Sequence, residues 1–259
     1  MCGLAGILLH PQERSEEEWQ IIRRTFSETL ISNEERGRDA AGAALVQRDG
    51  TYRIFKQPVA ASQLIEMPGY QALLAEVGPD TACLLGHTRA PTKGSRWDNA
   101  NNHPLIAGQV IGVHNGHIHN DDELFAGLSL PRHGHVDSEV IFRLLDTVEP
   151  WRRNGGYLTA VRQRMALLQG RFATLSVDLW HPDRLLVLKQ NVPLCVHYHA
   201  PWQALCFSSR YVFLRKAFGR SVITEALDPG YAYLFDIHHL PQRGKEPVEQ
   251  VTLAPSGSR

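Results

Sequence analysis

The chain has 259 residues, a length that fits one large domain or two small ones. Lys plus Arg and Asp plus Glu both number 27, so the formal net charge is zero and the composition provides no broad positive field for nucleic acid or an anionic membrane. No apolar run approaches the ~20 residues that a membrane-spanning helix needs, and the N-terminus lacks a signal-peptide pattern, so we expect a soluble protein of the cytoplasm.

The first half of the chain alternates apolar runs with helical patterns. Ser15 to Glu18 forms a capping-box pattern, and apolar residues then recur at helical spacing. Asp49-Gly50 between two apolar segments is typical of a hairpin turn. The expected elements are a strand over 2–9, a helix over about 16–33, strands over 41–46 and 52–55, a helix through the 60s and 70s interrupted at Pro68-Gly69, a strand ending near His87, and a long loop over 90–108.

The second half begins mainly with helices and ends with strands. The expected elements are a strand over 110–114, helices over 121–127, 137–148 and 156–169, and strands over 172–179, 185–189, 193–199, 203–208, 222–225 and 231–236. Blocks of helices and strands without a strict βαβ rhythm indicate an α+β fold with largely antiparallel sheets. Beyond about residue 240 the sequence is polar, so we expect one domain over 1–240 and a frayed tail over 241–259.

Four widely spaced cysteines without a CxxC pair favour reduced thiols over a disulfide framework. Cys83, Cys195 and Cys206 lie in apolar segments and are expected in the core. Cys2 differs, because removal of Met1 would place a free thiol and a free α-amine in one residue. The amine, with a pKa of about 7.7–8.0, can then take the thiol proton without any histidine. The alternative is that Cys2 is merely a small residue near a chain end.

Six segments bear on this choice. The start Met-Cys-Gly-Leu-Ala-Gly is followed by Glu-Arg-Gly-Arg-Asp-Ala-Ala-Gly over 35–42, Gly-His-Thr-Arg-Ala-Pro-Thr-Lys-Gly over 86–94, Asn-His-Pro over 102–104, Val-His-Asn-Gly-His-Ile-His-Asn over 113–120 and Val-Asp-Ser-Glu-Val over 136–140. Together they resemble the glutaminase domain of the class II glutamine amidotransferases, most closely that of the glutamine–fructose-6-phosphate aminotransferases, to about residue 236. The resemblance implies a four-layer αββα sandwich of the N-terminal nucleophile hydrolase type, with Cys2 as the nucleophile.

The resemblance also implies how L-glutamine is held. Arg89 matches the arginine that grips the α-carboxylate, a task that suits a planar guanidinium, although a surface salt bridge is the alternative. Asp137 matches the aspartate that meets the α-ammonium group, although it could instead cap the following helix. Asn115 and Gly116 match the oxyanion hole through the Asn amide and the Gly N–H, although Asn-Gly could also form a plain hairpin turn.

Four further residues match supporting positions of the same family, and His114 is interpreted from its place beside the Asn-Gly pair. Thr88 and Thr92 correspond to positions near the substrate, with Thr92 in a loop that covers glutamine. Arg36 and Asp39 correspond to a segment that packs beside the nucleophile. His114 is expected to pack beside the oxyanion turn.

Two departures from the family concern the covering loop. The aminosugar synthases have a Trp and a His where this chain has Ala90 and Lys93. That Trp belongs to the part of the loop that senses closure and gates ammonia. The hydrolytic chemistry therefore carries over from the resemblance, whereas the gating mechanism does not.

Thirteen histidines suggest a metal hypothesis. Three His-x-His pairs, at 117/119, 133/135 and 197/199, could each place two imidazoles on one strand face. No carboxylate or cysteine lies at ligand spacing from them, so we expect neither a metal nor another cofactor.

The matched segments predict an enzyme that hydrolyses the glutamine side-chain amide through a Cys2 thioester, giving glutamate and ammonia. Family members fuse this domain to a synthase that uses the ammonia, and this chain ends about where the synthase would begin, so we expect a separate synthase partner. Its acceptor and the oligomeric state stay open. The alternatives are an N-terminal nucleophile amidase acting on another amide, and a non-catalytic subunit that senses glutamine.

Overall fold

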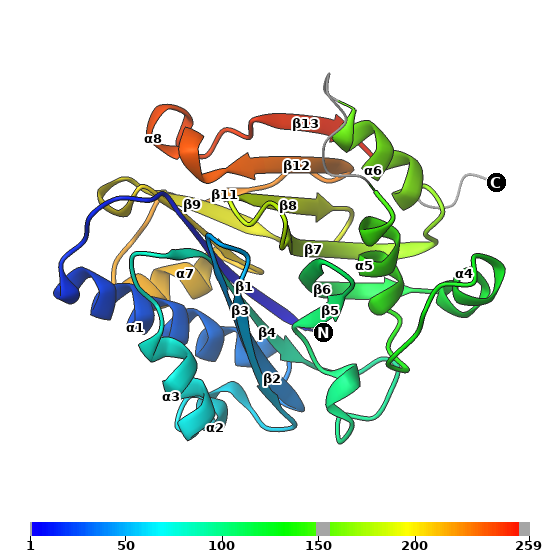
Figure 1. Ribbon diagram of the computed structural model, residues 1–259. Helices are drawn as coiled ribbons and strands as arrows, with labels where there is room; N and C mark the ends of the chain where they lie inside the picture. Colours follow the sequence, from blue (N-terminus) through cyan, green and yellow to red (C-terminus); the bar gives the residue numbers. More distant parts are fainter. Residues whose placement is uncertain (1, 149–155, 254–259) are drawn as a thin grey trace.

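The computed structural model describes residues 2–148 and 156–253, which form two antiparallel sheets (Figure 1). The first sheet has the strand order β11 (Glu225–Ala226), β9 (Cys195–His199), β10 (Ala204–Ser208), β1 (Gly3–Leu9), β4 (Thr81–Arg89), β2 (Ala40–Gln47) and β3 (Tyr52–Gln57). The second has the order β13 (Glu249–Thr252), β12 (Tyr231–Asp236), β8 (Arg184–Lys189), β7 (Gly170–Asp178), β6 (Val110–Ile118) and β5 (Leu105–Ala107).

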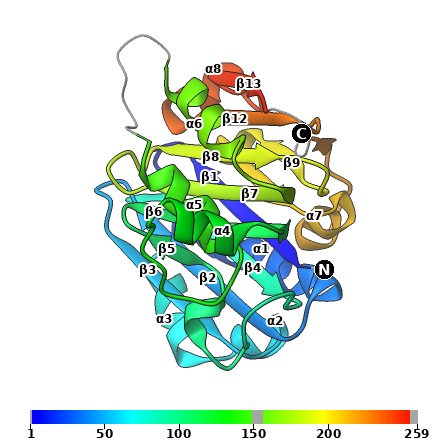
Figure 2. The same cartoon turned by 90° about the vertical axis from the view of Figure 1, so that its right-hand side faces the viewer.

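Helices cover the outer face of each sheet (Figures 1 and 2). Those on the first sheet are α1 (Glu16–Asn33), α2 (Ala61–Leu64), α3 (Pro68–Ala75) and α7 (Tyr211–Phe218). Those on the second are α5 (Glu139–Asp146) and α6 (Tyr157–Met165), with α4 (Asp121–Gly127) beside α5. The short helix α8 (Leu240–Arg243) precedes β13. The 3₁₀ turns are η1 (Glu34–Arg36), η2 (Asn99–Asn101), η3 (Ala200–Trp202) and η4 (Ile237–His239).

Three apolar cores separate these layers. The middle core joins the two sheets through side chains such as Leu4, Val113 and Leu175. The outer cores join each sheet to its own helices, through residues such as Phe26 of α1 and Phe142 of α5. The layer order is therefore helix, sheet, sheet, helix, as the resemblance implied.

The strand β1 lies in the middle of the first sheet, between β10 and β4, and all seven of its residues are buried. Its neighbours approach closely because two of its residues are glycine. A Cβ at Gly3 would come within 2.6 Å of Thr88 Oγ1, and one at Gly6 would come within 2.7 Å of Leu175 Cδ1 in the opposite sheet. This packing places Cys2 beside the end of β4 and at a cavity that residues of both sheets line.

Several predicted elements are confirmed by the structure. The capping box of α1 is present, since Ser15 Oγ accepts from Glu18 N at 3.2 Å and a Glu18 oxygen accepts from Ser15 N at 2.9 Å. The β2–β3 hairpin turns at Asp49-Gly50, and α3 begins at Pro68 after a break in the chain's helical path. The predicted helices over 137–148 and 156–169 are shorter in the structure, as α5 and α6.

Two elements were not predicted, and one prediction needs correction. The helix α7 and the strand β5 were not anticipated from the sequence. The expected frayed tail is wrong as far as residue 253, because β13 pairs with β12 from Tyr231 opposite Thr252 to Leu234 opposite Glu249. Polar residues fit β13 because it is an edge strand with one exposed face. Residues 254–259 lie outside the described residues.

No helix within the described ranges has the length and apolar character that crossing a membrane requires.

Candidate active site

Cys2 lies beside the start of the β4–β5 loop, the segment 90–104 that connects these two strands. The Ala90 backbone N–H donates to Cys2 Sγ at 3.4 Å. Arg36 holds the same residue through its backbone, because Arg36 Nε donates to Cys2 O at 2.6 Å. The half-buried thiol borders a cavity. The cavity lining includes Arg36, Ala90, Thr92, Asn115, Gly116 and Arg171.

The electrostatic surroundings of Cys2 keep its thiol protonated at rest. Burial raises the pKa of the thiol and outweighs the hydrogen bond from Ala90 and the positive charge of Arg89, both of which lower it. The negative charge of Asp137 adds to the increase. Because the thiolate is the nucleophilic form, any reaction at Cys2 needs a base that takes the proton.

The other three cysteines are buried and unpaired, as the sequence indicated. Burial raises the pKa of Cys206 to about 12, and it also raises the pKa values of Cys83 and Cys195. None of the three lines the cavity beside Cys2. Cys2 is therefore the one of the four thiols that borders this cavity.

Asn115 and Gly116 lie within β6, and the hairpin turn considered at this Asn-Gly pair is wrong. The ladder between β6 and β7 continues through both residues, with Asn115 opposite Ala173 and Gly116 opposite Phe172. The φ angle of Gly116 is 137°, and a Cβ at this position would lie 1.8 Å from Arg171 O. The long ladder overrides the local turn preference, and glycine is required for the close backbone approach.

Arg89 ends β4 and lies under the loop with only 2% of its surface exposed, which excludes the alternative of a surface salt bridge. Its Nη1 donates to Asn102 Oδ1 at 2.8 Å, and its Nη2 donates to Lys93 O at 2.6 Å and to Gly94 O at 3.0 Å. These bonds occupy three of the five N–H donors that a guanidinium carries. Arg89 thus shapes the loop and retains two donors for other acceptors.

Asp137 is buried at the edge of β6. Its Oδ2 accepts from Ile118 N at 2.7 Å and lies 3.4 Å from His117 Nδ1. The residue at the N-cap of α5 is Ser138, and no side-chain capping bond forms there. The alternative role of Asp137 as the cap of this helix is therefore wrong, and its carboxylate instead binds strand β6 close to Gly116.

Five predicted residues lie outside the cavity lining: Arg89 and Asp137, described above, and Thr88, Asp39 and His114. Thr88 is fully buried, and its Oγ1 donates to Asn33 O at 2.8 Å. Asp39 Oδ1 accepts from Arg96 Nη1 at 3.0 Å, which ties the loop to the segment before β2. His114 is buried in β6, where burial lowers its pKa to about 4, so it is neutral at physiological pH.

A cluster of charged side chains connects the loop to α4. Lys93 Nζ lies 2.6 Å from Asp121 Oδ2 and 2.8 Å from Asp122 Oδ1. Arg132 pairs with the same two carboxylates at 3.0 and 2.6 Å. This Lys93 cluster gives the loop a charged anchor, in a segment where the resemblance suggests an aromatic one and this chain has Ala90.

Several residues at the site were not predicted, among them His117, Asn191, Val192 and Pro193 of the cavity lining. Arg171 of β7 lines the cavity. Ser209 directly follows β10, and its Oγ lies 2.8 Å from Asn115 Nδ2. Neither residue falls in a recognised segment, and Ser209 approaches Asn115 only because β10 pairs with β1. No local sequence signal could have indicated that contact.

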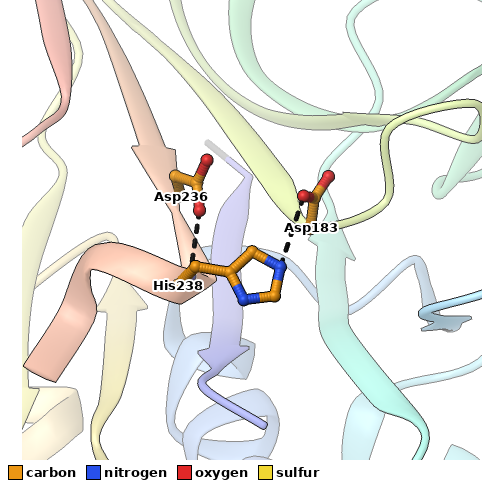
Figure 3. A group of neighbouring side chains, drawn as sticks. All are labelled: Asp183, Asp236 and His238. Atoms are coloured by element: carbon orange, nitrogen blue, oxygen red, sulfur yellow. Dashed lines mark hydrogen bonds and ion pairs between the residues drawn. The ribbon is translucent and has the colours of Figure 1, made fainter.

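Among the described residues, one group has the spacing of a metal site, namely Asp183, Asp236 and His238 (Figure 3). His238 Nε2 lies 3.5 Å from Asp183, and the backbone N–H of His238 donates to Asp236. The other oxygen of Asp236 pairs with Arg184 Nε at 3.1 Å. Since a guanidinium already neutralises this carboxylate, the group is an ion-pair network at the end of β12. The predicted His-x-His pairs contribute no residue to it.

Comparison with known proteins places this geometry in context. The family model described as "Glutamine amidotransferase domain" matches residues 92–216. The 7-cyano-7-deazaguanine synthase of Saccharolobus solfataricus is 29% identical over 213 residues, which are 81% of this chain and 43% of that protein. The glutamine–fructose-6-phosphate aminotransferase of Corynebacterium efficiens is 31% identical over 200 residues, which are 76% of this chain and 31% of that protein. The chain therefore spans less than half the length of these two curated relatives.

A solved structure of glutamine phosphoribosylpyrophosphate amidotransferase from B. subtilis shares the fold, with a TM-score of 0.71 over 98% of this chain and 50% of that one. Its sequence identity is 17%, so the likeness concerns the fold alone. The four-layer arrangement expected from the sequence is thereby confirmed.

If the Lys93 cluster anchors the loop, its loss should make the loop more accessible to proteolysis. In the variant Lys93→Met, trypsin should cleave after Arg96 roughly 3- to 10-fold faster, because each lost ion pair contributes about 0.2–1 kcal/mol to the closed loop. Mass spectrometry of the fragments measures the rate. The matched control is Lys245→Met, which removes an exposed ion pair with Glu225 at a site distant in sequence. Equal cleavage of wild type and Lys93→Met would contradict the anchoring role.

Proposed function

The chain carries a class II glutamine amidotransferase domain, the enzyme module that takes ammonia from the side-chain amide of glutamine, and on that premise we propose that Cys2 is its nucleophile. One observation carries the proposal. Cys2, which directly precedes β1 of the first sheet, and Asn115 and Gly116 of the second sheet line one cavity, although Cys2 is more than 100 residues from the other two in the chain.

The proposed reaction begins when Met1 has been removed. The α-amine of Cys2, directly or through a water, takes the thiol proton as Sγ attacks the amide carbon of glutamine. The proton then passes to the amide nitrogen, the carbon–nitrogen bond breaks, and ammonia leaves a thioester on Cys2. Water attacks the thioester, which releases glutamate and restores the thiol. The raised pKa of the thiol supports the need for such a base.

Two donors support stabilisation of the tetrahedral oxyanion. Successive N–H groups of a strand alternate sides, and His119 N bonds to Gln169 O beyond the end of β7. Ile118 N points the other way, to Asp137, so the N–H of Gly116 shares that second side. There it is free of β7 and adjacent to the cavity that Asn115 also borders. Donors preorganised in this way contribute about 2.7–4 kcal/mol each to the transition state.

The two charges of the amino acid have buried partners of opposite sign in this proposal. Asp137 receives the α-ammonium group, and the two uncommitted donors of Arg89, with Thr92 of the cavity lining, receive the α-carboxylate. A site with both charges favours a free amino acid over a neutral amide. This is the feature that separates the proposal from an amidase of another specificity and, with an intact nucleophile, from a glutamine sensor.

The ammonia is proposed to reach a separate synthase partner. The relatives that share this domain are longer proteins, named as a 7-cyano-7-deazaguanine synthase and an aminotransferase, and this chain covers 43% and 31% of them. The two names differ in the product formed, so the domain by itself is compatible with more than one acceptor. A reducing compartment such as the cytoplasm suits an enzyme that depends on a free thiol.

The proposal predicts distinct kinetic effects for two substitutions. Cys2→Ala should abolish glutamate formation. Asn115→Ala should lower kcat on the order of 10²- to 10³-fold with little change in KM, because the lost donor acts on charge that exists only in the transition state. Steady-state release of glutamate measures both. Residual activity of Cys2→Ala, or an Asn115→Ala defect confined to KM, would refute the assignments, and hydrolysis of other amides at a similar rate would favour the rival amidase.

If the loop must close over glutamine, the rate of glutamine hydrolysis should depend on the synthase partner. Ala90 offers no large apolar anchor, and the partly exposed Lys93 ion pairs are weak substitutes for one, so the loop of the isolated protein should open readily and glutamine hydrolysis should be slow. Docking of the synthase should accelerate it, with Trp97 of the loop, which is 71% exposed, as the nearest aromatic contact. Kinetics of the protein alone and with its partner and acceptor measure the effect. Turnover of about 10 per second by the isolated chain, unchanged by any partner, would leave a stand-alone glutaminase instead.

A further inference from the structure

Ser209 holds the nucleophile strand at its first residues. The side chain of Ser209 is fully buried immediately after β10. Its backbone N–H donates to Leu4 O at 3.1 Å, and its Oγ accepts from Leu4 N at 2.8 Å. Both backbone groups of Leu4 are thus satisfied by one residue, two positions beyond Cys2.

The same hydroxyl reaches the opposite sheet. Ser209 Oγ lies 2.8 Å from the amide nitrogen of Asn115, a residue that is 1% exposed. With that nitrogen as donor, the hydroxyl accepts two N–H groups, from Asn115 and from Leu4, and its own proton has no acceptor among the described residues. The amide oxygen of Asn115 is buried and also lacks a partner there. The two partners of this contact therefore leave one donor, the Ser209 O–H, and one acceptor, Asn115 Oδ1, without a hydrogen bond among the described residues.

Rotation of the Asn115 carboxamide by about 180° gives both unsatisfied groups a hydrogen-bond partner or a place at the reactant. Oxygen and nitrogen of an amide have nearly the same size, so their places can be exchanged without other movement, and the bonding network decides between them. After the exchange, Ser209 O–H donates to Asn115 Oδ1 while Ser209 Oγ still accepts from Leu4 N. The NH₂ group then occupies the place that no protein group fills. Buried donors and acceptors strongly favour such complete pairing.

We propose that Ser209 is the positioning residue that orients the Asn115 carboxamide with its NH₂ group toward the oxyanion of the reaction at Cys2. The inference rests on the proposed function and deepens it. Asn115 borders the cavity beside Cys2. The amide atom that Ser209 does not hold is buried and has no partner among the described residues, and the proposal assigns it to the reactant. In the opposite orientation, an oxygen would face the developing negative charge and repel it.

The contact between Ser209 and Asn115 also constrains the distance between Cys2 and the Asn115 carboxamide. Cys2 directly precedes β1 of the first sheet and Asn115 lies in the second, and the non-directional packing of apolar side chains in the middle core does not by itself fix their relative position. Ser209 bonds to Leu4 on one side and to Asn115 on the other. The nucleophile strand and the oxyanion donor are therefore connected through one hydroxyl group.

Four variants separate this role from a purely structural one. They are Ser209→Ala, Asn115→Ala, the double variant, and the matched control Ser208→Ala. Ser208 is equally buried and its Oγ accepts from Asn33 Nδ2 at 2.9 Å, so its loss costs a hydrogen bond in the same strand without touching Asn115. Each variant is measured for glutamate release and for thermal unfolding.

Ser209→Ala should lower kcat on the order of 10-fold or more, but by less than Asn115→Ala does, because the carboxamide is still present. Its KM should change less than about twofold. Ser208→Ala should keep kcat. In the Asn115→Ala background, Ser209→Ala should cause no further loss, because the group that it positions is gone. If Ser209→Ala does not fold, Ser209→Cys, which offers only a weak S–H donor, should show an intermediate kcat.

Two results would overturn the inference. Either Ser209→Ala keeps the kcat of Ser208→Ala, or the losses from Ser209→Ala and Asn115→Ala multiply in the double variant. Failure of the proposed function is distinguishable, because wild type would then release no glutamate or Asn115→Ala would keep its kcat, and the inference would fall with it. If Asn115→Ala loses kcat and Ser209→Ala does not, only the role of Ser209 is refuted.

Discussion

The two hydrogen bonds between Leu4 and Ser209 fix the direction in which the chain leaves β1 toward Cys2. Apolar burial drives the two sheets together, but it is non-directional and does not fix their relative position. Hydrogen bonds have narrow limits of distance and angle and can supply that precision. At this site the precision is needed between sheets, since Cys2 directly precedes a strand of one and Asn115 lies in the other. The contact that crosses between them is that of Ser209 Oγ with Asn115 Nδ2, at 2.8 Å.

The loop over the cavity depends on a different balance of forces. Arg89 holds its backbone from inside through Lys93 O and Gly94 O, while the ammonium group of Lys93 reaches outward to Asp121. The inner contacts are buried and weakly affected by salt, whereas the outer pair is partly exposed and screened by it. The outer ion pairs can therefore break without disturbing the core, whereas opening of the whole loop also requires the loss of the inner Arg89 contacts.

The parts of the fold that the sequence predicted are those with local causes. The helix α1 follows from the Ser15–Glu18 capping box and the spacing of its apolar residues. Asn115 and Asp137 were found through recognised segments, but their surroundings were not: the Asn-Gly turn preference yielded to the β6–β7 ladder. The edge strand β13 resembled a tail because half of its side chains face solvent. Ser209 has no local signal, since its contacts are set by strand pairing across the molecule.

Everything proposed for the site depends on Cys2 acting as an N-terminal nucleophile toward glutamine. The most direct test is peptide mapping of the active protein after treatment with a glutamine analogue that carries a diazo-ketone in place of the amide. The account predicts one irreversible adduct, on Cys2 of a chain that lacks Met1, with Cys83, Cys195 and Cys206 unmodified and glutamine protecting against labelling. An adduct on any of those three, or full activity in protein that retains Met1, would contradict it.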